Sequence, residues 1–185
     1  MSTVDILFED DDLLVVNKPA GLGTQAPRQF DSLEARVRKY LESKQPESPY
    51  LGIPHRLDRC VSGVVLFAKR KKAAQRLSRQ FEKREIDKSY LGLISGKPEQ
   101  SNGTWRDTMR KVPDEPRSEL VSADHADAKA AVLHYRVSRS NGLLTLLEIK
   151  LETGRMHQIR LQCSARGHAI LGDRLYGSEQ DLGPP

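Results

Sequence analysis

The stretch His55-Arg56-Leu57-Asp58-Arg59-Cys60-Val61-Ser62-Gly63 organises the interpretation of this chain of 185 residues. It places one carboxylate, Asp58, between two arginines, and it ends in Ser-Gly directly before the apolar run Val64 to Ala68. A short apolar run that follows a glycine is typical of a buried strand. The sequence therefore predicts that Asp58 lies in a loop immediately before a strand.

The length and composition predict a soluble protein of modest size. A chain of 185 residues fits one domain, or one domain split into two halves by a cleft. It can bury about 70% of its unfolded surface without a metal or a disulfide. No apolar run approaches the roughly 18 residues that cross a membrane, and the acidic N-terminus does not resemble a secretory signal. We therefore expect a cytoplasmic protein without a membrane contact.

The charge pattern indicates a polyanionic partner. The net charge is +5 and the sequence pI is near 9.3, which favours association with nucleic acid without identifying it. A helix is predicted over about 71–83, because Ala73, Leu77 and Phe81 recur every four residues. Its other face is basic: Lys71, Lys72, Arg76, Arg79 and Lys83. These side chains are expected to neutralise phosphates, the alternative being a merely solvated helix face.

The remaining pattern predicts an α+β domain. A helix begins after Asp31 or Ser32, with Leu33, Val37 and Tyr40 or Leu41 facing inward. Strands are expected at 13–17, 88–95, 132–139 and 143–151, the last two joined through Asn141-Gly142, a strong signal for a hairpin with a two-residue turn. A second short helix is expected at about 156–166, ending at Gly167. The polar segment 99–127 is interpreted as loops and an insert.

The two cysteines, Cys60 and Cys163, give no sign of a metal or redox site. Neither belongs to a Cys-x-x-Cys pair, and both are expected to be reduced. Small packed side chains are the favoured interpretation. The sequence also has no dinucleotide-binding glycine fingerprint and no P-loop.

A second run, Gly154-Arg155-Met156-His157-Gln158-Ile159-Arg160, completes a set of motifs. The others are Val15 to Gly21, Lys88 to Leu93, Gly172-Asp173 and Tyr176-Gly177. Together with the Asp58 stretch they resemble the RNA pseudouridine synthases of the RluA-like family (large-subunit rRNA pseudouridine synthase A type), from about Leu13 to Gly177. This resemblance implies a mixed, mainly antiparallel central sheet with flanking helices and a central active-site cleft.

The resemblance also implies an activity. Such an isomerase converts uridine to pseudouridine in structured rRNA or tRNA, a step of RNA modification that needs no redox cofactor and no metal. The chain is expected to be a monomer and a single catalytic domain, residues 1–185, without a separate N-terminal RNA-binding domain. It ends where family members usually continue into a further C-terminal segment.

The resemblance assigns roles to individual residues. Asp58 is the expected catalytic carboxylate, acting as a nucleophile or stabilising a cationic sugar, and Arg160 is its expected counter-ion. Tyr90 is expected to stack on uracil and to take a sugar proton. Arg56 would help to extrude the target nucleotide, and Ile159 would pack on the uracil face. His55, His157 and Gln158 are expected to shape their loops, with Asp173 as an anchoring carboxylate.

Two other functions remain open at this stage. Val61, Met156 and Gln162 replace residues that are usual in the family, two threonines and a histidine, so an inactive relative that binds RNA or a ribosomal particle is one alternative. A metal-dependent nuclease that uses His55, Asp58 and His157 as ligands is another. The arginines adjoining both segments argue against a cation site.

Overall fold

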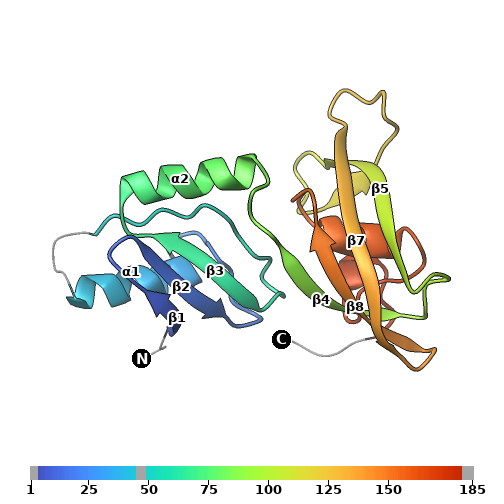
Figure 1. Ribbon diagram of the computed structural model, residues 1–185, viewed down its shortest axis with the longest axis horizontal. Helices are drawn as coiled ribbons and strands as arrows, with labels where there is room; N and C mark the ends of the chain where they lie inside the picture. The colour runs from blue at the N-terminus through green and yellow to red at the C-terminus, as the bar shows by residue number, and fades with distance from the viewer. Residues whose placement is uncertain (1–3, 45–48, 181–185) are drawn as a thin grey trace. The chain divides into compact units, whose positions relative to one another are not determined.

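The computed structural model describes residues 4–44 and 49–180. The expectation of a shortened C-terminus concerns the end of the chain, which lies outside the described residues. The chain folds as two compact units (Figure 1), of which the first runs to Ile86 and the second begins at Asp87. Each unit has its own sheet and its own helices, and each is described by itself.

The first unit is built on a three-stranded antiparallel sheet. Its strands, in spatial order, are β1 (Asp5–Glu9), β2 (Leu13–Lys18) and β3 (Gly63–Ala68). Two helices complete it, α1 (Leu33–Lys44) and α2 (Lys71–Glu82). Strand β3 confirms the strand expected after the Asp58 stretch, whereas β1 was not expected from the sequence.

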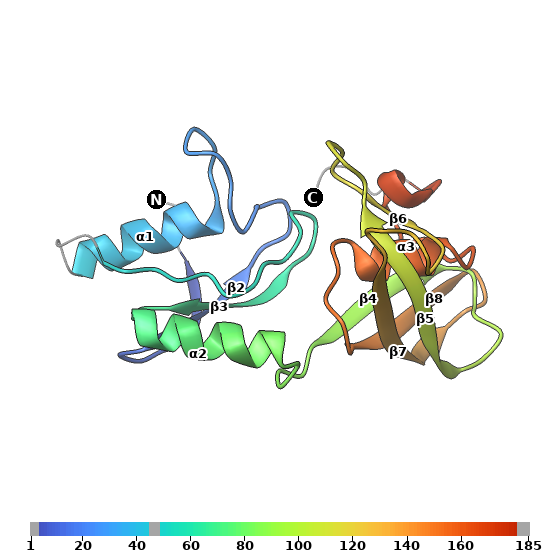
Figure 2. The same cartoon turned by 90° about the horizontal axis from the view of Figure 1, so that it is seen from above.

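The two helices cover opposite faces of this sheet, and Figure 2 shows β2 and β3 running between them. Strand residues alternate between the faces, because successive side chains of a strand point in opposite directions. One face packs on α1, with the buried residues Leu14, Val16, Val65, Phe67, Leu33, Val37 and Leu41. The other packs on α2, with Leu13, Leu66, Ala68, Ala73 and Leu77. The inward face predicted for α1 is thereby confirmed, as is that of α2 at Ala73 and Leu77, whereas Phe81 is only half-buried.

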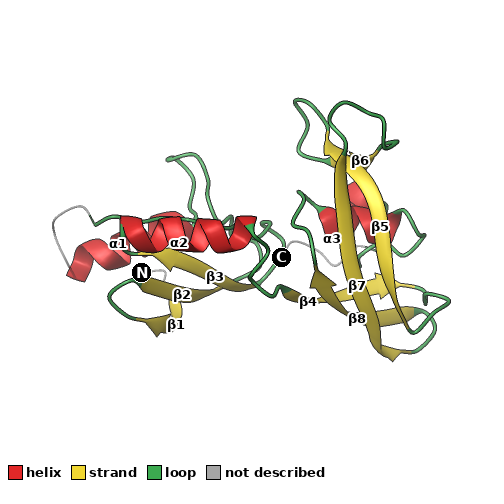
Figure 3. Cartoon of the chain, turned by 45° about the horizontal axis from the view of Figure 1, so that its top comes forward, coloured by secondary structure: helices red, strands yellow, loops and turns green. Residues whose placement is uncertain are grey.

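The second unit is a five-stranded antiparallel sheet with short helices on one face (Figure 3). In spatial order its strands are β4 (Ser89–Ser95), β8 (Leu144–Leu151), β7 (Lys129–Ser140), β5 (Asn102–Lys111) and β6 (Ser118–Leu120). Helix α3 (Gln158–Ser164) and the 3-10 turn η1 (Arg174–Tyr176) follow. The α+β class with mainly antiparallel strands is confirmed, and the strands are divided between two sheets.

The core of the second unit lies between this sheet and α3. The rings of Trp105 and Tyr135 pack with their centroids 4.5 Å apart, and Leu147, Ile149 and Cys163 complete the cluster with Ile94 and Leu133. Cys163 is buried in this core, which confirms its expected role as a packed side chain, and burial raises the pKa of its thiol to about 12. The same interpretation is wrong for Cys60, which is exposed.

Two local expectations differ from the structure. The hairpin of β7 and β8 is present, but its loop is 141–143, three residues rather than two, with Gly142 at φ 88°. The interpretation of 99–127 as loops is wrong, because residues 102–111 form β5 and 118–120 form β6. Only Trp105 and Met109 of β5 are buried, so its sequence lacks the apolar alternation that marks a strand.

None of the helices in residues 4–44 and 49–180 is long and apolar enough to cross a membrane.

The first unit is also held by an ionic cluster around Glu9, at the end of β1. The Glu9 carboxylate accepts hydrogen bonds from Tyr40 Oη at 2.7 Å and from Lys44 Nζ at 2.9 Å, both on α1. It also accepts one from Lys69 Nζ at 2.9 Å, directly after β3. Burial favours the neutral form of Glu9, but these bonds outweigh it and lower its pKa to about 2. One carboxylate thus joins β1, α1 and the end of β3.

The variant Glu9→Gln is expected to lower the stability of the protein at neutral pH. Because the pKa of Glu9 is lower in the folded chain than its ordinary value of 4.5, its contribution is fully present above that ordinary value and is lost as the pH falls towards 2. Allowing for solvent screening, the loss should be on the order of 1 kcal/mol at pH 7. Urea unfolding should be measured from pH 7 to pH 2. The free energies of unfolding of the wild type and the variant should converge as the pH falls, and exposed Glu42→Gln is the control. A difference in the free energy of unfolding that stays constant from pH 7 to pH 2 would contradict the stabilising role of the Glu9 carboxylate.

Candidate active site

The Asp58 loop is tied to the turn that follows β2. Gly21 N donates to Arg59 O at 2.8 Å, and Arg59 Nε donates back to Gly21 O at 2.8 Å. Within the loop, Val61 N donates to Asp58 O at 3.1 Å. These bonds fix the backbone immediately after the half-buried Asp58.

Thr24 fixes the backbone immediately before Asp58. Its Oγ1 donates to Leu57 O at 2.8 Å and accepts from Leu57 N at 3.1 Å. The Thr24 side chain is buried, so solvent does not compete for either bond. Asp58 is therefore braced on both sides by the segment 18–24, which overlaps the motif Val15 to Gly21.

Lys18 is the residue of this loop system that the sequence analysis did not single out. It is 0% exposed, and its Nζ donates to Leu22 O at 2.6 Å, Pro19 O at 2.9 Å and Arg59 O at 3.3 Å. Burial lowers its pKa, and the nearby Cys60 and Asp58 partly oppose this shift. One signal was available, because Lys18 continues the inward alternation of Leu14 and Val16 along β2.

His55 has a structural role, as expected. Its Nε2 accepts a hydrogen bond from Leu66 N at 2.9 Å, and its ring stacks on Phe81 with the centroids 4.8 Å apart. The first contact joins the loop to β3 and the second joins it to α2. The lone pair on Nε2 is used in this bond, and the part of the chain that the structure describes contains no group of three His, Cys, Asp or Glu side chains placed to hold a metal ion. The nuclease hypothesis gains no support. Arg56, next in the chain, is exposed.

In the second unit, two predicted site residues meet on one apolar cluster. Tyr90 lies on β4 opposite Ile149 of β8, and Ile159 lies in the first turn of α3. Both are partly buried against the same core, which includes Ile94, Trp105 and Ile149. The structure therefore brings together segments that are about 70 residues apart in the sequence.

The motifs around Tyr90 and Arg160 also meet through their backbones. Leu151 N donates to Lys88 O at 3.0 Å, so the chain entering Gly154 runs beside the start of β4. A Cβ atom at Gly154 would lie 3.4 Å from Lys88 Nζ. A side chain at 154 would therefore come into van der Waals contact with the lysine two residues before Tyr90.

Arg160 is held by Asp173 in a two-point ion pair. Arg160 Nε lies 2.6 Å from Asp173 Oδ2, and Nη2 lies 2.8 Å from Oδ1. The two side chains are only 16% and 7% exposed, and the guanidinium carbon lies 5.0 Å from the ring centroid of Tyr176. Asp173 is thus the anchor of Arg160, as its expected structural role suggested. Asp58 belongs to the other unit, and its pairing with Arg160 stays a prediction.

Gln158 and His157 hold the turn that leads into α3. Gln158 Oε1 accepts from Thr153 Oγ1 at 2.7 Å and from Arg155 N at 3.0 Å. His157 has φ 55°, and its Nδ1 lies 3.0 Å from Tyr176 Oη. These contacts agree with the positioning roles expected of both residues.

Gln162 continues this network on the next turn of α3. It is 0% exposed, and its Nε2 donates to Asp107 Oδ2 at 2.6 Å while its Oε1 accepts from Gln158 Nε2 at 3.1 Å. Arg166 Nη1 reaches the same Asp107 oxygen at 2.9 Å. An amide at 162 therefore satisfies both neighbours.

The basic residues of α2 lie on its exposed side. They are Lys71, Lys72, Arg76 and Arg79. Their placement is compatible with the phosphate contacts expected of them, and their role as a binding face stays a prediction.

The variant Asp173→Asn should destabilise the second unit. It keeps the shape of the side chain but removes the negative charge that Asp173 places beside the Arg160 guanidinium, which is mostly buried. We expect a loss of about 2 kcal/mol in the free energy of unfolding, measured in urea. The control is Asp127→Asn, an exposed carboxylate of the same unit, which should unfold like the wild type. Equal midpoints for all three proteins would contradict the anchoring role.

Comparison with known proteins relates both motif segments to one family. The sequence model of the RNA pseudouridylate synthases matches residues 12–165. An uncharacterized RNA pseudouridine synthase, YhcT of Bacillus subtilis, is 36% identical over 183 residues, which cover 97% of this chain and 59% of that relative. Ribosomal large subunit pseudouridine synthase C of Rickettsia prowazekii is 33% identical, over 95% of this chain and 57% of its own length. The chain thus spans less than two-thirds of these relatives.

The fold of this chain is also similar to that of a solved structure from the same family. A solved structure of human RNA pseudouridylate synthase domain containing 4 superposes with a TM-score of 0.80 at 26% sequence identity, covering 97% of this chain and 71% of that one. The matched sequence, residues 12–165, includes the Asp58 loop, Tyr90 and the start of α3. The chain belongs to the RNA pseudouridylate synthase family.

Proposed function

We propose that this protein is an RNA pseudouridine synthase, an isomerase that converts uridine to pseudouridine in structured rRNA or tRNA. The observation that carries the proposal is the arrangement within the second unit, where Tyr90 and Ile159 pack on one core and Arg160 is held in a fixed orientation. In the first unit, Asp58 is held in a separately braced loop. Relatives named as ribosomal large subunit synthases favour rRNA as the substrate.

The proposed reaction exchanges one bond of the ribose for another. The bond from ribose C1′ to uracil N1 breaks, the base rotates, and C1′ bonds to C5, which loses a proton while N1 gains one. Asp58 acts as nucleophile or stabilises the cationic sugar, and Arg160 is its counter-ion. Tyr90 stacks on the base and takes a proton from the sugar, which it returns to the sugar when C1′ bonds to C5. No electrons pass to a second molecule, so this sequence of steps requires no redox cofactor.

The same proposal assigns the binding residues. A base inside a stack must be extruded before it can react, at a cost of a few kcal/mol. Arg56, which is exposed at the edge of the Asp58 loop, fills the space that the base leaves, since a planar guanidinium stacks well. Ile159 packs on the uracil face. The exposed side chains of α2 neutralise phosphates: Lys71, Lys72, Arg76 and Arg79.

We propose further that the two units, within residues 1–185, act together as one catalytic domain, as a monomer in the cytoplasm. The catalytic assignments come from both units, with Asp58 in the first and Tyr90 and Arg160 in the second. Activity therefore depends on their association on the RNA.

The direct test uses RNA from a strain of the source organism that lacks the gene. Incubation with the wild-type protein, followed by chemical mapping of pseudouridine, should reveal at least one new modified position. Asp58→Asn should lower the rate by at least about a thousandfold while RNA binding is retained. Undiminished isomerisation by this variant would remove Asp58 from the mechanism. No modified position with the wild type would favour the inactive, RNA-binding alternative.

A second test concerns the brace at Thr24. Thr24→Val removes the hydroxyl that holds Leu57, so Asp58 should be less well positioned. We expect kcat to fall about tenfold with little change in KM, together with a loss of about 1 kcal/mol in stability. Thr145→Val is the matched control, because Thr145 is also a buried hydroxyl, bonded to Gly96 O at 2.6 Å. It should lose stability but keep its kcat, and equal kcat losses in both variants would contradict a specific role for Thr24.

A further inference from the structure

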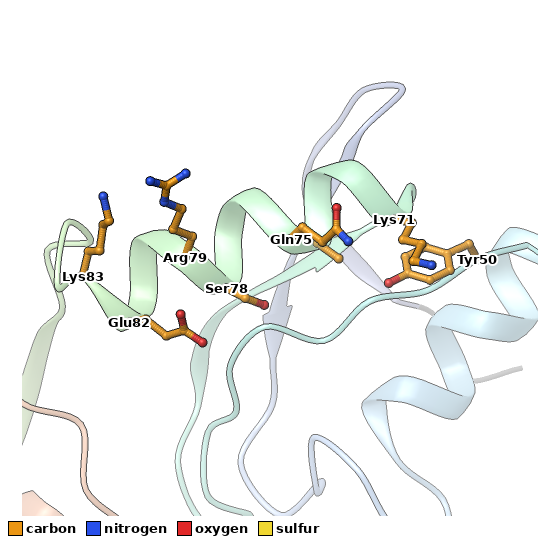
Figure 4. A pocket seen from close by; sticks show the side chains of 8 residues that line it. Tyr50, Lys71, Gln75, Ser78, Arg79, Glu82 and Lys83 are labelled. Carbon is orange, nitrogen blue, oxygen red and sulfur yellow. The ribbon is translucent and has the colours of Figure 1, made fainter.

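A groove runs along α2 in the first unit, away from the Asp58 loop residues described above. Its volume is about 590 Å³, and it lies between α2 and the segment that contains Tyr50 (Figure 4). The polar side chains that line it on the helix are Lys71, Gln75, Ser78, Arg79, Glu82 and Lys83. Figure 4 shows Tyr50 beside Lys71 at one end, with Arg79 and Lys83 further along the helix.

Tyr50 is held in position without being buried. Gly52, two residues later, exchanges two backbone hydrogen bonds of 2.9 Å with Ala68 at the end of β3. A Cβ atom on Gly52 would lie 2.7 Å from Ala74 Cβ and 3.3 Å from the ring carbon Cε1 of Tyr50. The segment is therefore pressed against α2, which only glycine allows at position 52. The Tyr50 side chain remains 45% exposed, so a fixed aromatic ring faces the groove.

The charge of the groove is mainly positive. Lys71, Arg79 and Lys83 line it, against one carboxylate, Glu82. Within residues 4–44 and 49–180, neither Lys71 nor Arg79 forms an ion pair, and Lys83 reaches Glu85 only at 4.0 Å. A helix of 12 residues is about 18 Å long, so the cations are spread over a length that fits a strand with repeated phosphates rather than a single anion.

We propose that this groove binds a single-stranded segment of RNA that flanks the target uridine. One base stacks on Tyr50, and the backbone phosphates contact Lys71, Arg79 and Lys83. A fixed aromatic ring beside a line of cations is the combination by which proteins bind single-stranded nucleic acid without strong sequence preference. Gln75, Ser78 and Glu82 offer polar groups to base edges. The inference rests on the proposed function for the identity of its ligand.

The first experiment measures binding of the full chain to a fluorescein-labelled, uridine-rich oligoribonucleotide of about twelve residues by fluorescence anisotropy. Tyr50→Ala should weaken binding about tenfold, whereas Tyr50→Phe keeps the stacking surface and should bind like the wild type. Lys39→Ala removes an exposed cation from α1, on the opposite side of the sheet, and serves as the control. Equal affinity of Tyr50→Ala and the wild type would overturn the stacking assignment.

The second measurement tests the cations and the class of ligand. Arg79→Ala should weaken binding and should reduce the slope of log K against log salt by about 0.7, the value for one phosphate contact on a single strand. An unlabelled polyglutamate peptide should displace the RNA poorly. Displacement as effective as that by unlabelled RNA would show recognition of charge alone and would overturn the proposal, as would an unchanged salt slope in Arg79→Ala.

A photocrosslink locates the contact directly. An oligoribonucleotide that carries 5-iodouridine should crosslink to the peptide that contains Tyr50, and the crosslink should be lost in Tyr50→Ala. Crosslinks confined to other peptides would overturn the placement. Failure here is distinguishable from failure of the proposed function. If pseudouridine forms in total RNA but RNA binding does not depend on Tyr50, only the proposal for the groove is rejected. If RNA binding depends on Tyr50 but no pseudouridine forms, only the proposed isomerase activity is rejected.

Discussion

The buried ammonium group of Lys18 is the constraint on which the first unit's site depends. The residues around Asp58 belong to no helix or strand, so periodic hydrogen bonding does not fix them. Lys18 instead draws together the carbonyls of Pro19, Leu22 and Arg59. Removing an ammonium from water is costly unless its donors are satisfied, and these carbonyls satisfy them. The turn after β2 and the loop after Leu57 therefore stabilise each other through this charge.

In the second unit, the site is positioned by a network of side-chain amides and ion pairs. Helix α3 has seven residues, too few to be stable by itself in water. Its orientation comes from side chains instead: Gln158 bonds the preceding turn, Gln162 bonds the sheet at Asp107, and Asp173 fixes the Arg160 guanidinium. A site whose polar groups are already held by hydrogen bonds and ion pairs to neighbouring side chains needs little rearrangement when a substrate binds. Asp58 lies in an irregular loop, whereas Tyr90 lies on β4 and Arg160 on α3. Asp58 and Arg160 are each positioned by residues to which no chemistry is assigned.

The outcome for individual elements shows what the sequence could and could not predict. Helices α1 and α2 were predicted with their inward faces because Val37 and Leu77 belong to clear periodic stripes. Strand β5 was missed because its ten residues place only Trp105 and Met109 in the core, and its stability comes from pairing with β7.

The same distinction between local and long-range features applies to the candidate site. Motifs placed Asp58, Tyr90 and Arg160 as candidates, since their residue types and spacing are local properties of the chain. The ion pair of Arg160 with Asp173 and the three-carbonyl role of Lys18 depend on long-range geometry. A lysine at the end of a strand most often points to solvent. The alternation along β2 indicates that Lys18 points inward, but its three carbonyl partners are known only from the folded turn and loop.

Helix α2 links the proposed groove to the proposed catalytic loop. Near one end, Ala74 packs against Gly52 and thereby sets the position of Tyr50. Near the other, Phe81 stacks on His55, three residues before Asp58. RNA held along the exposed side of α2 would therefore bear on the same helix that braces the Asp58 loop. Binding energy from parts of a substrate that do not react can be used to position the parts that do. Within the first unit, α2 connects the proposed RNA contacts to the Asp58 loop through one short helix.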